Sequence, residues 1–299
     1  MRMKTAVAGT TPRFAPFAAA AVLALSGCAA ATGSSTPAPS AAPPPGSPGS
    51  TAADNRGSAD GPGGTPGASE PAGPLEGATV VVDPGHNGGN ADAPDRISES
   101  VDAGHGRKAC DTVGAETDTG YTEHAFNWDV AKRLRSHLEE RGAEVVLTRE
   151  DDESVGPCIT ERAEIGNEAR ADAAISIHAD GGPPSGRGFH VIAPGELDGY
   201  TDDIAEPSHR LAVDLRAEFE EGTGRPRADY IAEDGLDLRT DLGGLNLSDV
   251  PKVFLEAGNM RNSADAAKLT DPEWRESAAE SIAAGISRFL RDEQGGHDG

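Results

Sequence analysis

The chain has 299 residues, a formal net charge of -24 and an isoelectric point of about 4.6. Such acidity argues against a nucleic-acid partner, because binding a phosphate backbone requires clusters of Lys and Arg. The length suits one large domain or two small ones.

The N-terminus is typical of an export signal. Basic residues precede an apolar stretch from Phe14 to Leu25, which is too short to span a bilayer as a mature helix. The stretch ends in Leu25-Ser26-Gly27-Cys28, which resembles the lipobox of bacterial lipoproteins. We therefore expect residues 1–27 to be a lipoprotein signal peptide and Cys28 to be lipidated. The alternative is an ordinary export signal with a chance cysteine.

Residues 28–74 are almost entirely Ala, Pro, Gly, Ser and Thr. Such a segment buries too little apolar surface to offset its ordering entropy, so we expect a disordered linker. Residues 75–292 are expected to form a single folded domain, and residues 293–299 a flexible tail.

Strand-like and helix-like patterns alternate along the folded part. The expected strands are residues 79–83, 144–148, 173–178, 188–193 and 252–255. The expected helices are residues 122–141, 160–171, 205–221 and 272–290. This order predicts an α/β fold: a single domain with a mixed, mostly parallel sheet and helices on both faces.

Two cysteines remain once Cys28 is set aside. Cys110 and Cys158 most simply form a disulfide in an exported chain. The alternative is two buried free thiols, and neither cysteine has a Cys or His neighbour at the spacing of a metal finger. The segment 87–120 between them has no strong period, and we expect it to form a wall of any site that follows the first strand.

Two apolar runs each end at a histidine, His86 and His178. Ligands bind beyond the carboxyl ends of parallel strands, so both imidazoles are expected at one edge of the sheet. Strand alternation places His178 on the opposite side from Ile175 and Ile177. Together with an acidic partner, two such imidazoles would form a metal site, although either histidine alone is more often structural.

Two glutamates are the candidate acidic partners. Glu123 begins a predicted helix, where a favourable interaction with the helix dipole would also explain it. Glu256 ends an apolar strand at the same edge as the histidines, and a buried Glu without a partner is costly. It either faces a metal-bound water or pairs with Arg261. His190 is the one serious substitute for a ligand.

Four blocks of sequence resemble the zinc-dependent N-acetylmuramoyl-L-alanine amidases of the amidase 3 family, in its actinobacterial type. They are residues 82–86, 120–123, 175–180 and 250–262. The resemblance implies that His86, Glu123 and His178 bind Zn²⁺ and that Glu256 is the catalytic residue. Asn87 and Asn259 depart from the common family form, which puts substrate contacts rather than the metal in question.

The resemblance implies a cell-wall hydrolase that cleaves the amide bond between N-acetylmuramic acid and L-alanine of peptidoglycan. Its partners would be peptidoglycan or muropeptide fragments, and the membrane through a lipid anchor on Cys28. We expect a monomer on the outer face of the cell membrane, facing the wall. Two alternatives stay open: a catalytically inactive peptidoglycan-binding lipoprotein, and a zinc peptidase of stem peptides.

Overall fold

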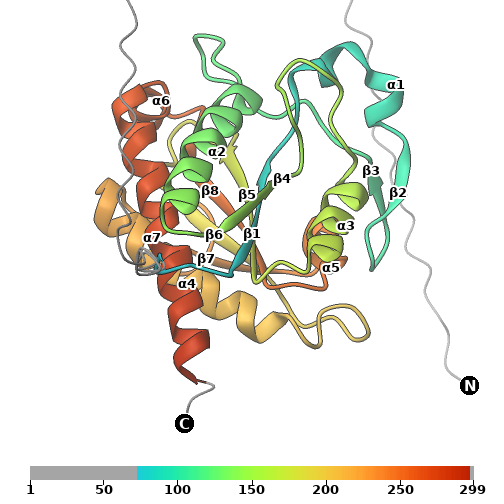
Figure 1. Ribbon diagram of the computed structural model, residues 1–299. Coiled ribbons are helices and arrows are strands. Elements are labelled where there is room, and N and C mark those ends of the chain that lie inside the picture. Colours follow the sequence, from blue (N-terminus) through green and yellow to red (C-terminus); the bar gives the residue numbers. More distant parts are fainter. Residues whose placement is uncertain (1–72, 297–299) are drawn as a thin grey trace, which may run out of the picture. The chain divides into compact units, whose positions relative to one another are not determined.

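A six-stranded sheet positions the candidate site in the computed structural model, which describes residues 73–296 (Figure 1). The strand order is β4-β1-β5-β8-β6-β7. The strands are β1 (Thr79–Pro84), β4 (Glu144–Leu147), β5 (Ala173–Asp180), β6 (His190–Pro194), β7 (Leu236–Arg239) and β8 (Lys252–Asn259). Strands β4, β1, β5 and β8 are parallel, β6 is antiparallel to β8, and β7 is parallel to β6.

Helices cover both faces of this sheet. Helices α2 (Glu123–Glu140), α4 (Ala205–Thr223) and α7 (Pro272–Gly296) pack together on one face. Helices α3 (Ile159–Ala169) and α5 (Gly243–Asn246) lie on the other. The predicted α/β class with a mostly parallel mixed sheet is thus confirmed. The shorter elements are η1 (Gly88–Asp92), α1 (Pro94–Ile97), α6 (Ser263–Leu269) and the hairpin of β2 (Ser100–Asp102) and β3 (Arg107–Ala109).

The two faces of the sheet differ in polarity because side chains alternate along each strand. One face carries the main hydrophobic core, in which Val80, Val82, Ile175 and Ile177 pack against α2, α4 and α7. The other face is partly polar although it is buried. Its polar members include Asp83, Ser176 and Lys252. The candidate site therefore lies above a polar layer rather than above the core.

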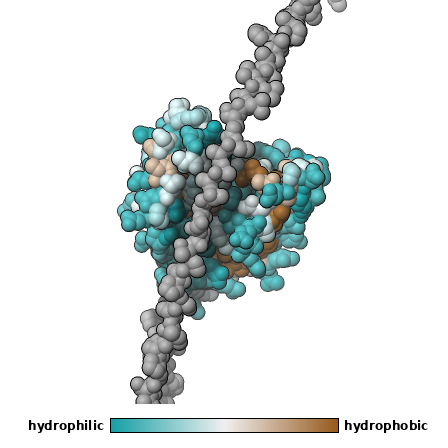
Figure 2. Space-filling view, turned by 90° about the horizontal axis from the view of Figure 1, so that it is seen from above, coloured by the Kyte–Doolittle hydropathy of each residue, from teal (hydrophilic) through white to brown (hydrophobic). Residues whose placement is uncertain are grey.

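The face of the domain seen in Figure 2 is mainly hydrophilic, in keeping with the acidic composition. The large apolar side chains that are exposed lie in separate segments of the chain: Val113, Val155, Tyr200, Ile231 and Leu238. Within residues 73–296, no helix is both long enough and apolar enough to cross a membrane.

The long regular elements agree with the predicted ones, with ends displaced by a few residues. Helix α7 continues to Gly296, beyond the predicted end at Leu290. Strand β7 and the β2–β3 hairpin were not predicted, since strands of three or four residues give almost no periodic signal. The predicted signal peptide, Cys28 and nearly all of the linker lie outside the described residues.

The segment between the first strand and α2 is built from η1, α1 and the β2–β3 hairpin. The expected disulfide joins this segment to a later part of the chain: Cys110 is bonded to Cys158, with an S–S length of 2.02 Å. Cys158 is the N-cap residue of α3. The bond therefore ties this segment to the helix that covers the polar face of the sheet.

Reduction of this disulfide is expected to lower the free energy of unfolding by about 4 kcal/mol, because it releases a loop constraint across a sequence separation of 48 residues. Urea unfolding with and without a reductant measures the change. A variant with both Cys110→Ala and Cys158→Ala is the control and should not respond to the reductant. Equal stability of the reduced and oxidised wild-type protein would contradict the prediction.

Candidate metal centre

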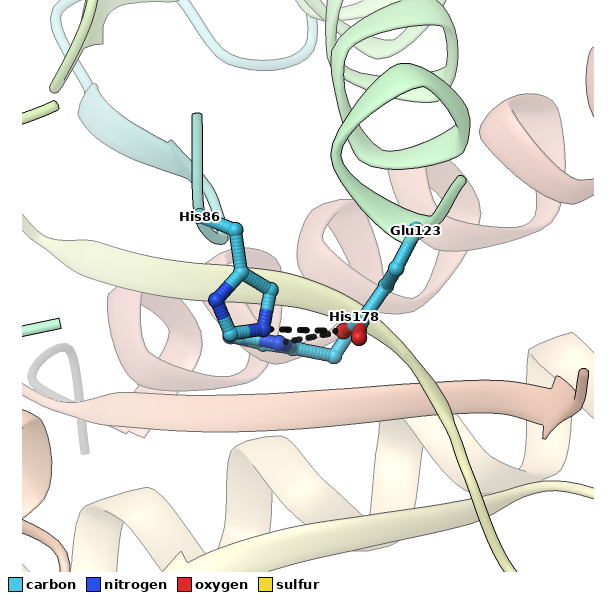
Figure 3. A group of neighbouring side chains, drawn as sticks. All are labelled: His86, Glu123 and His178. Carbon is cyan, nitrogen blue, oxygen red and sulfur yellow. Dashed lines mark hydrogen bonds and ion pairs between the residues drawn. The ribbon is translucent and has the colours of Figure 1, made fainter. Parts of the chain in front are cut away.

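Three elements deliver the predicted ligands to one edge of the sheet. His86 follows the turn at the end of β1, His178 lies near the end of β5, and Glu123 is the first residue of α2 (Figure 3). His86 has a φ of 60°, a backbone conformation that non-glycine residues seldom adopt. The Arg162 guanidinium supports this turn by donating to the His86 carbonyl oxygen at 3.0 Å.

The ligand atoms of these three residues converge. All lie within 4.8 Å of one another. Glu123 Oε1 is 3.2 Å from His86 Nε2 and 2.9 Å from His178 Nδ1 (Figure 3). Two imidazole nitrogens and one carboxylate oxygen are a donor set that binds zinc and leaves a fourth position open in catalytic sites. The residues present fit a divalent metal ion.

The charges of these three side chains also favour a bound cation. Burial would lower the pKa of His86, but Glu123 and Asp111 outweigh it and raise the pKa to about 10. Burial would raise the pKa of Glu123, but His86 and His178 hold it well below its usual range. A buried carboxylate thus attracts positive charge to this point, whether it comes from a proton or from a metal ion.

Glu256 lies beside the three converging residues, on the strand next to β5 and in register with His178. Its Oε2 is buried and has no hydrogen-bond partner among the described residues. Burial raises the pKa of Glu256 well above its usual range, and the charges of Glu123 and Asp180 add to the effect. The alternative pairing with Arg261 is not formed, since Arg261 Nε lies 3.9 Å from Asp118 instead.

A cavity of about 530 Å³ opens onto this group of side chains. Among the residues that line it are the three convergent ones together with Glu256, Arg239 and Arg261. A second cavity of about 260 Å³ also borders His86 and His178 and contains the hydroxyl-bearing Ser176 in its wall. The site can therefore admit a ligand directly to the side chains that carry its chemistry.

Sequence reasoning missed several residues around the cavity. Arg239 comes from β7, which gave no sequence signal. Asp180 lies two residues beyond His178 and accepts a hydrogen bond from the Tyr230 hydroxyl at 2.8 Å. Its position at the end of an apolar strand could have identified Asp180 as a candidate site residue. His190, the suggested substitute ligand, is buried opposite Glu256 and is not part of the convergent group.

Asn87 and Asn259, the two departures from the common family form, face the protein rather than the cavity. Both are almost fully buried. Asn87 caps η1 through its side chain, and the Asn259 amide donates to the carbonyl oxygens of Pro183 and Gly186, each at 2.8 Å. They brace loops beside the site, so the expected effect on substrate contacts is indirect.

The fold and this donor set define an α/β protein with a candidate catalytic metal centre. Residues 80–288 match the family Amidase_3, described as N-acetylmuramoyl-L-alanine amidase, and the chain belongs to this family. The match spans nearly the whole described domain.

Similar proteins support this assignment. The chain is 43% identical to N-acetylmuramoyl-L-alanine amidase Rv3717 of Mycobacterium tuberculosis, over 72% of this chain and 88% of that protein. The crystal structure of the amidase Ami1 from Mycobacterium smegmatis matches with a TM-score of 0.68 and 42% identity, over 72% of this chain and 98% of that one. The apo form of Ami1 from Mycobacterium abscessus matches with the same TM-score, 43% identity and coverage of 72% and 100%. The predicted actinobacterial type is confirmed.

Proposed function

We propose that this protein hydrolyses the amide bond between N-acetylmuramic acid and L-alanine in peptidoglycan, with zinc held by His86, Glu123 and His178. The observation that carries the proposal is the convergence of these three side chains beside the unpartnered carboxylate of Glu256. The family supplies the identity of the bond. The same cavity borders all four residues, so one bound substrate would meet all of them.

Zinc, when bound, supplies a Lewis acid that acidifies water and polarises a carbonyl group. Glu256 is the group that takes the proton from the attacking water and delivers it to the leaving nitrogen of L-alanine. Burial raises the pKa of Glu256 above its usual range, and a raised pKa favours uptake of the proton from the attacking water. The cavity that borders His86, Glu123, His178 and Glu256 is where the substrate carbonyl would lie.

Digestion of purified peptidoglycan, followed by mass spectrometry of the soluble products, tests the function. We expect release of intact stem peptides that carry a free L-alanine amine, and no release after treatment with a chelator. Cleavage within the stem peptide would instead identify a zinc peptidase. Binding without any cleavage would identify an inactive wall-binding protein.

Zinc binding is expected to release at least one proton per protein at pH 7.5, because His86 is protonated in the metal-free protein below its pKa of about 10. Since zinc competes with this proton, zinc affinity should rise with pH between 7 and 10. Calorimetric titration in two buffers with different protonation enthalpies measures the number of protons. A binding heat that does not depend on the buffer would contradict this prediction.

We also infer that the protein is exported and anchored in the membrane through a lipid on Cys28. The support is the sequence alone, namely the apolar stretch that ends at a cysteine after small residues. In cells, the Cys28→Ala variant should move from the membrane fraction to the medium, whereas wild-type protein should stay with the membrane. Equal partitioning of the two proteins would contradict the lipid anchor.

A further inference from the structure

Beneath the candidate metal centre lies a buried polar cluster that the proposed chemistry does not use. It comprises Asp83 on β1, Ser176 on β5, Lys252 on β8, Arg162 on α3 and Asp111, and none of these is more than 8% exposed. Two carboxylates face two cations, so the charges balance. Buried charges are tolerated in proteins only when they are paired in this way.

Arg162 is the centre of this cluster. Its Nη1 donates to Asp83 Oδ1 at 2.8 Å, and its Nη2 donates to Asp111 Oδ2 at 3.2 Å. The guanidinium also donates to three backbone carbonyl oxygens, those of Pro84, His86 and Pro157. These five bonds match the five N–H donors of an arginine, so the group is held without freedom to rotate.

Asp111 connects the cluster to His86. Asp111 Oδ1 lies 3.2 Å from His86 Nδ1, and the Thr112 carbonyl oxygen lies 3.1 Å from the same nitrogen. Because both partners accept hydrogen bonds, Nδ1 must carry a proton. The other ring nitrogen, Nε2, is then the one that faces Glu123 and is left for a metal ion.

Ser176 connects the same cluster to His178. Ser176 Oγ lies 3.2 Å from His178 Nε2 and donates to Asp83 Oδ2 at 2.9 Å. The hydroxyl proton of Ser176 is used by Asp83, so Ser176 Oγ accepts from the Nε2 proton of His178. This leaves His178 Nδ1 facing Glu123. The two histidines therefore face Glu123 with different ring nitrogens. Asp111, the partner of His86, binds Arg162 directly. Ser176, the partner of His178, is linked to Arg162 through Asp83.

We propose that Arg162, acting through Asp83 and Asp111, is the positioning residue that fixes the ring orientation and tautomer of both histidine ligands. The inference rests on the proposed metal site at His86, Glu123 and His178. Partners of ligating histidines generally change metal affinity by 10- to 100-fold when they are removed. Here a single guanidinium would support two ligands from two different strands.

Ser176→Ala and Thr148→Ala provide a matched test. Both buried hydroxyls donate to Asp83, Ser176 to Oδ2 and Thr148 to Oδ1 at 2.6 Å, but only Ser176 touches a histidine. Zinc affinity, measured by competition with a chromophoric chelator, should fall about tenfold in Ser176→Ala and stay unchanged in Thr148→Ala. The absorption bands of the Co²⁺-loaded protein should shift only in Ser176→Ala.

A second matched pair of variants tests the contact between the cluster and His86. Asp111 and Asp152 each contact one histidine and one arginine, but Asp152 contacts His124 and Arg149, which are outside the convergent group. Asp111→Ala should therefore weaken zinc binding at least tenfold, and Asp152→Ala should not. Arg162→Lys keeps the buried charge but cannot bridge both carboxylates. It should weaken zinc binding more than Ser176→Ala does.

The outcomes separate this inference from the proposed function. A wild-type protein that binds no zinc would overturn the metal site itself, and this inference with it. A wild-type protein that binds zinc, with Ser176→Ala and Thr148→Ala equal in affinity and Co²⁺ spectrum, would overturn the positioning role alone. Thermal unfolding of each metal-free variant shows whether a lost affinity reflects a lost fold. Ser176→Ala removes no charge, so among these variants it should disturb the fold least.

Discussion

Glu256→Gln is expected to lower the rate of amide hydrolysis by about 10²–10⁴-fold while zinc affinity stays close to that of the wild-type protein. Glutamine has the shape of glutamate but cannot accept the proton of the attacking water. Because Glu256 is not one of the three converging ligand residues, the donor set remains complete. Hydrolysis of muropeptides and zinc content by atomic absorption are the two measurements.

Glu196→Gln is the control for this variant. Glu196 is exposed and follows β6, so the same change of charge occurs away from the cavity. Its activity should equal that of the wild-type protein. An active Glu256→Gln enzyme would remove Glu256 from the mechanism.

The same substitution is expected to raise the stability of the metal-free protein at neutral pH. The pKa of Glu256 is raised in the folded state, so the folded protein resists ionisation of this group. The resulting penalty grows as pH rises above the unfolded pKa of about 4.3. A neutral glutamine at this position avoids this penalty. The melting temperature of the metal-free variant should therefore exceed that of the wild-type protein at pH 7 and equal it near pH 4.

His178→Ala is expected to lose both zinc and hydrolysis. Removing one of three donors leaves two, and a catalytic zinc site normally needs three protein ligands. We expect activity at least 10³-fold lower than that of the wild-type protein, since the acidified water is lost with the metal. A chelator should have the same effect on the wild-type protein, and added zinc should restore the wild-type activity but not that of the variant.

Two other histidines serve as controls for His178→Ala. His209 is exposed on α4, and His209→Ala should behave as wild type. His190→Gln tests the substitute ligand and should keep its zinc, because His190 is outside the convergent group. Loss of zinc from His190→Gln together with its retention in His178→Ala would reverse the assignment of the ligands.

The positions of the candidate ligands could be predicted because each is attached to a strong local signal. His86 and His178 each end an apolar run, and Glu123 begins a helix with a clear period of hydrophobic residues. Parallel strands bring their carboxyl ends to one edge, so the signals combine without knowledge of side-chain packing. The disulfide was predictable for a similar reason, since only two cysteines were left to pair.

The supporting residues could not be predicted in the same way. Arg162 lies on α3, and its partners Asp83 and Asp111 come from two other segments of the chain. No local pattern separates such an arginine from one on a solvated helix face. Burial distinguishes them, and burial depends on the way α3 packs on the sheet.

The sequence alone determined the family, the fold class, the order of the long elements and the four residues proposed to carry the chemistry. These depend on hydrophobic periodicity and on residue types at strand ends, which are local properties of the chain. The tertiary structure decided the antiparallel direction of β6, the additional strand β7, the buried polar layer and the ring nitrogens that face one another. These depend on contacts between residues far apart in sequence, whose energies exist only once the chain has folded.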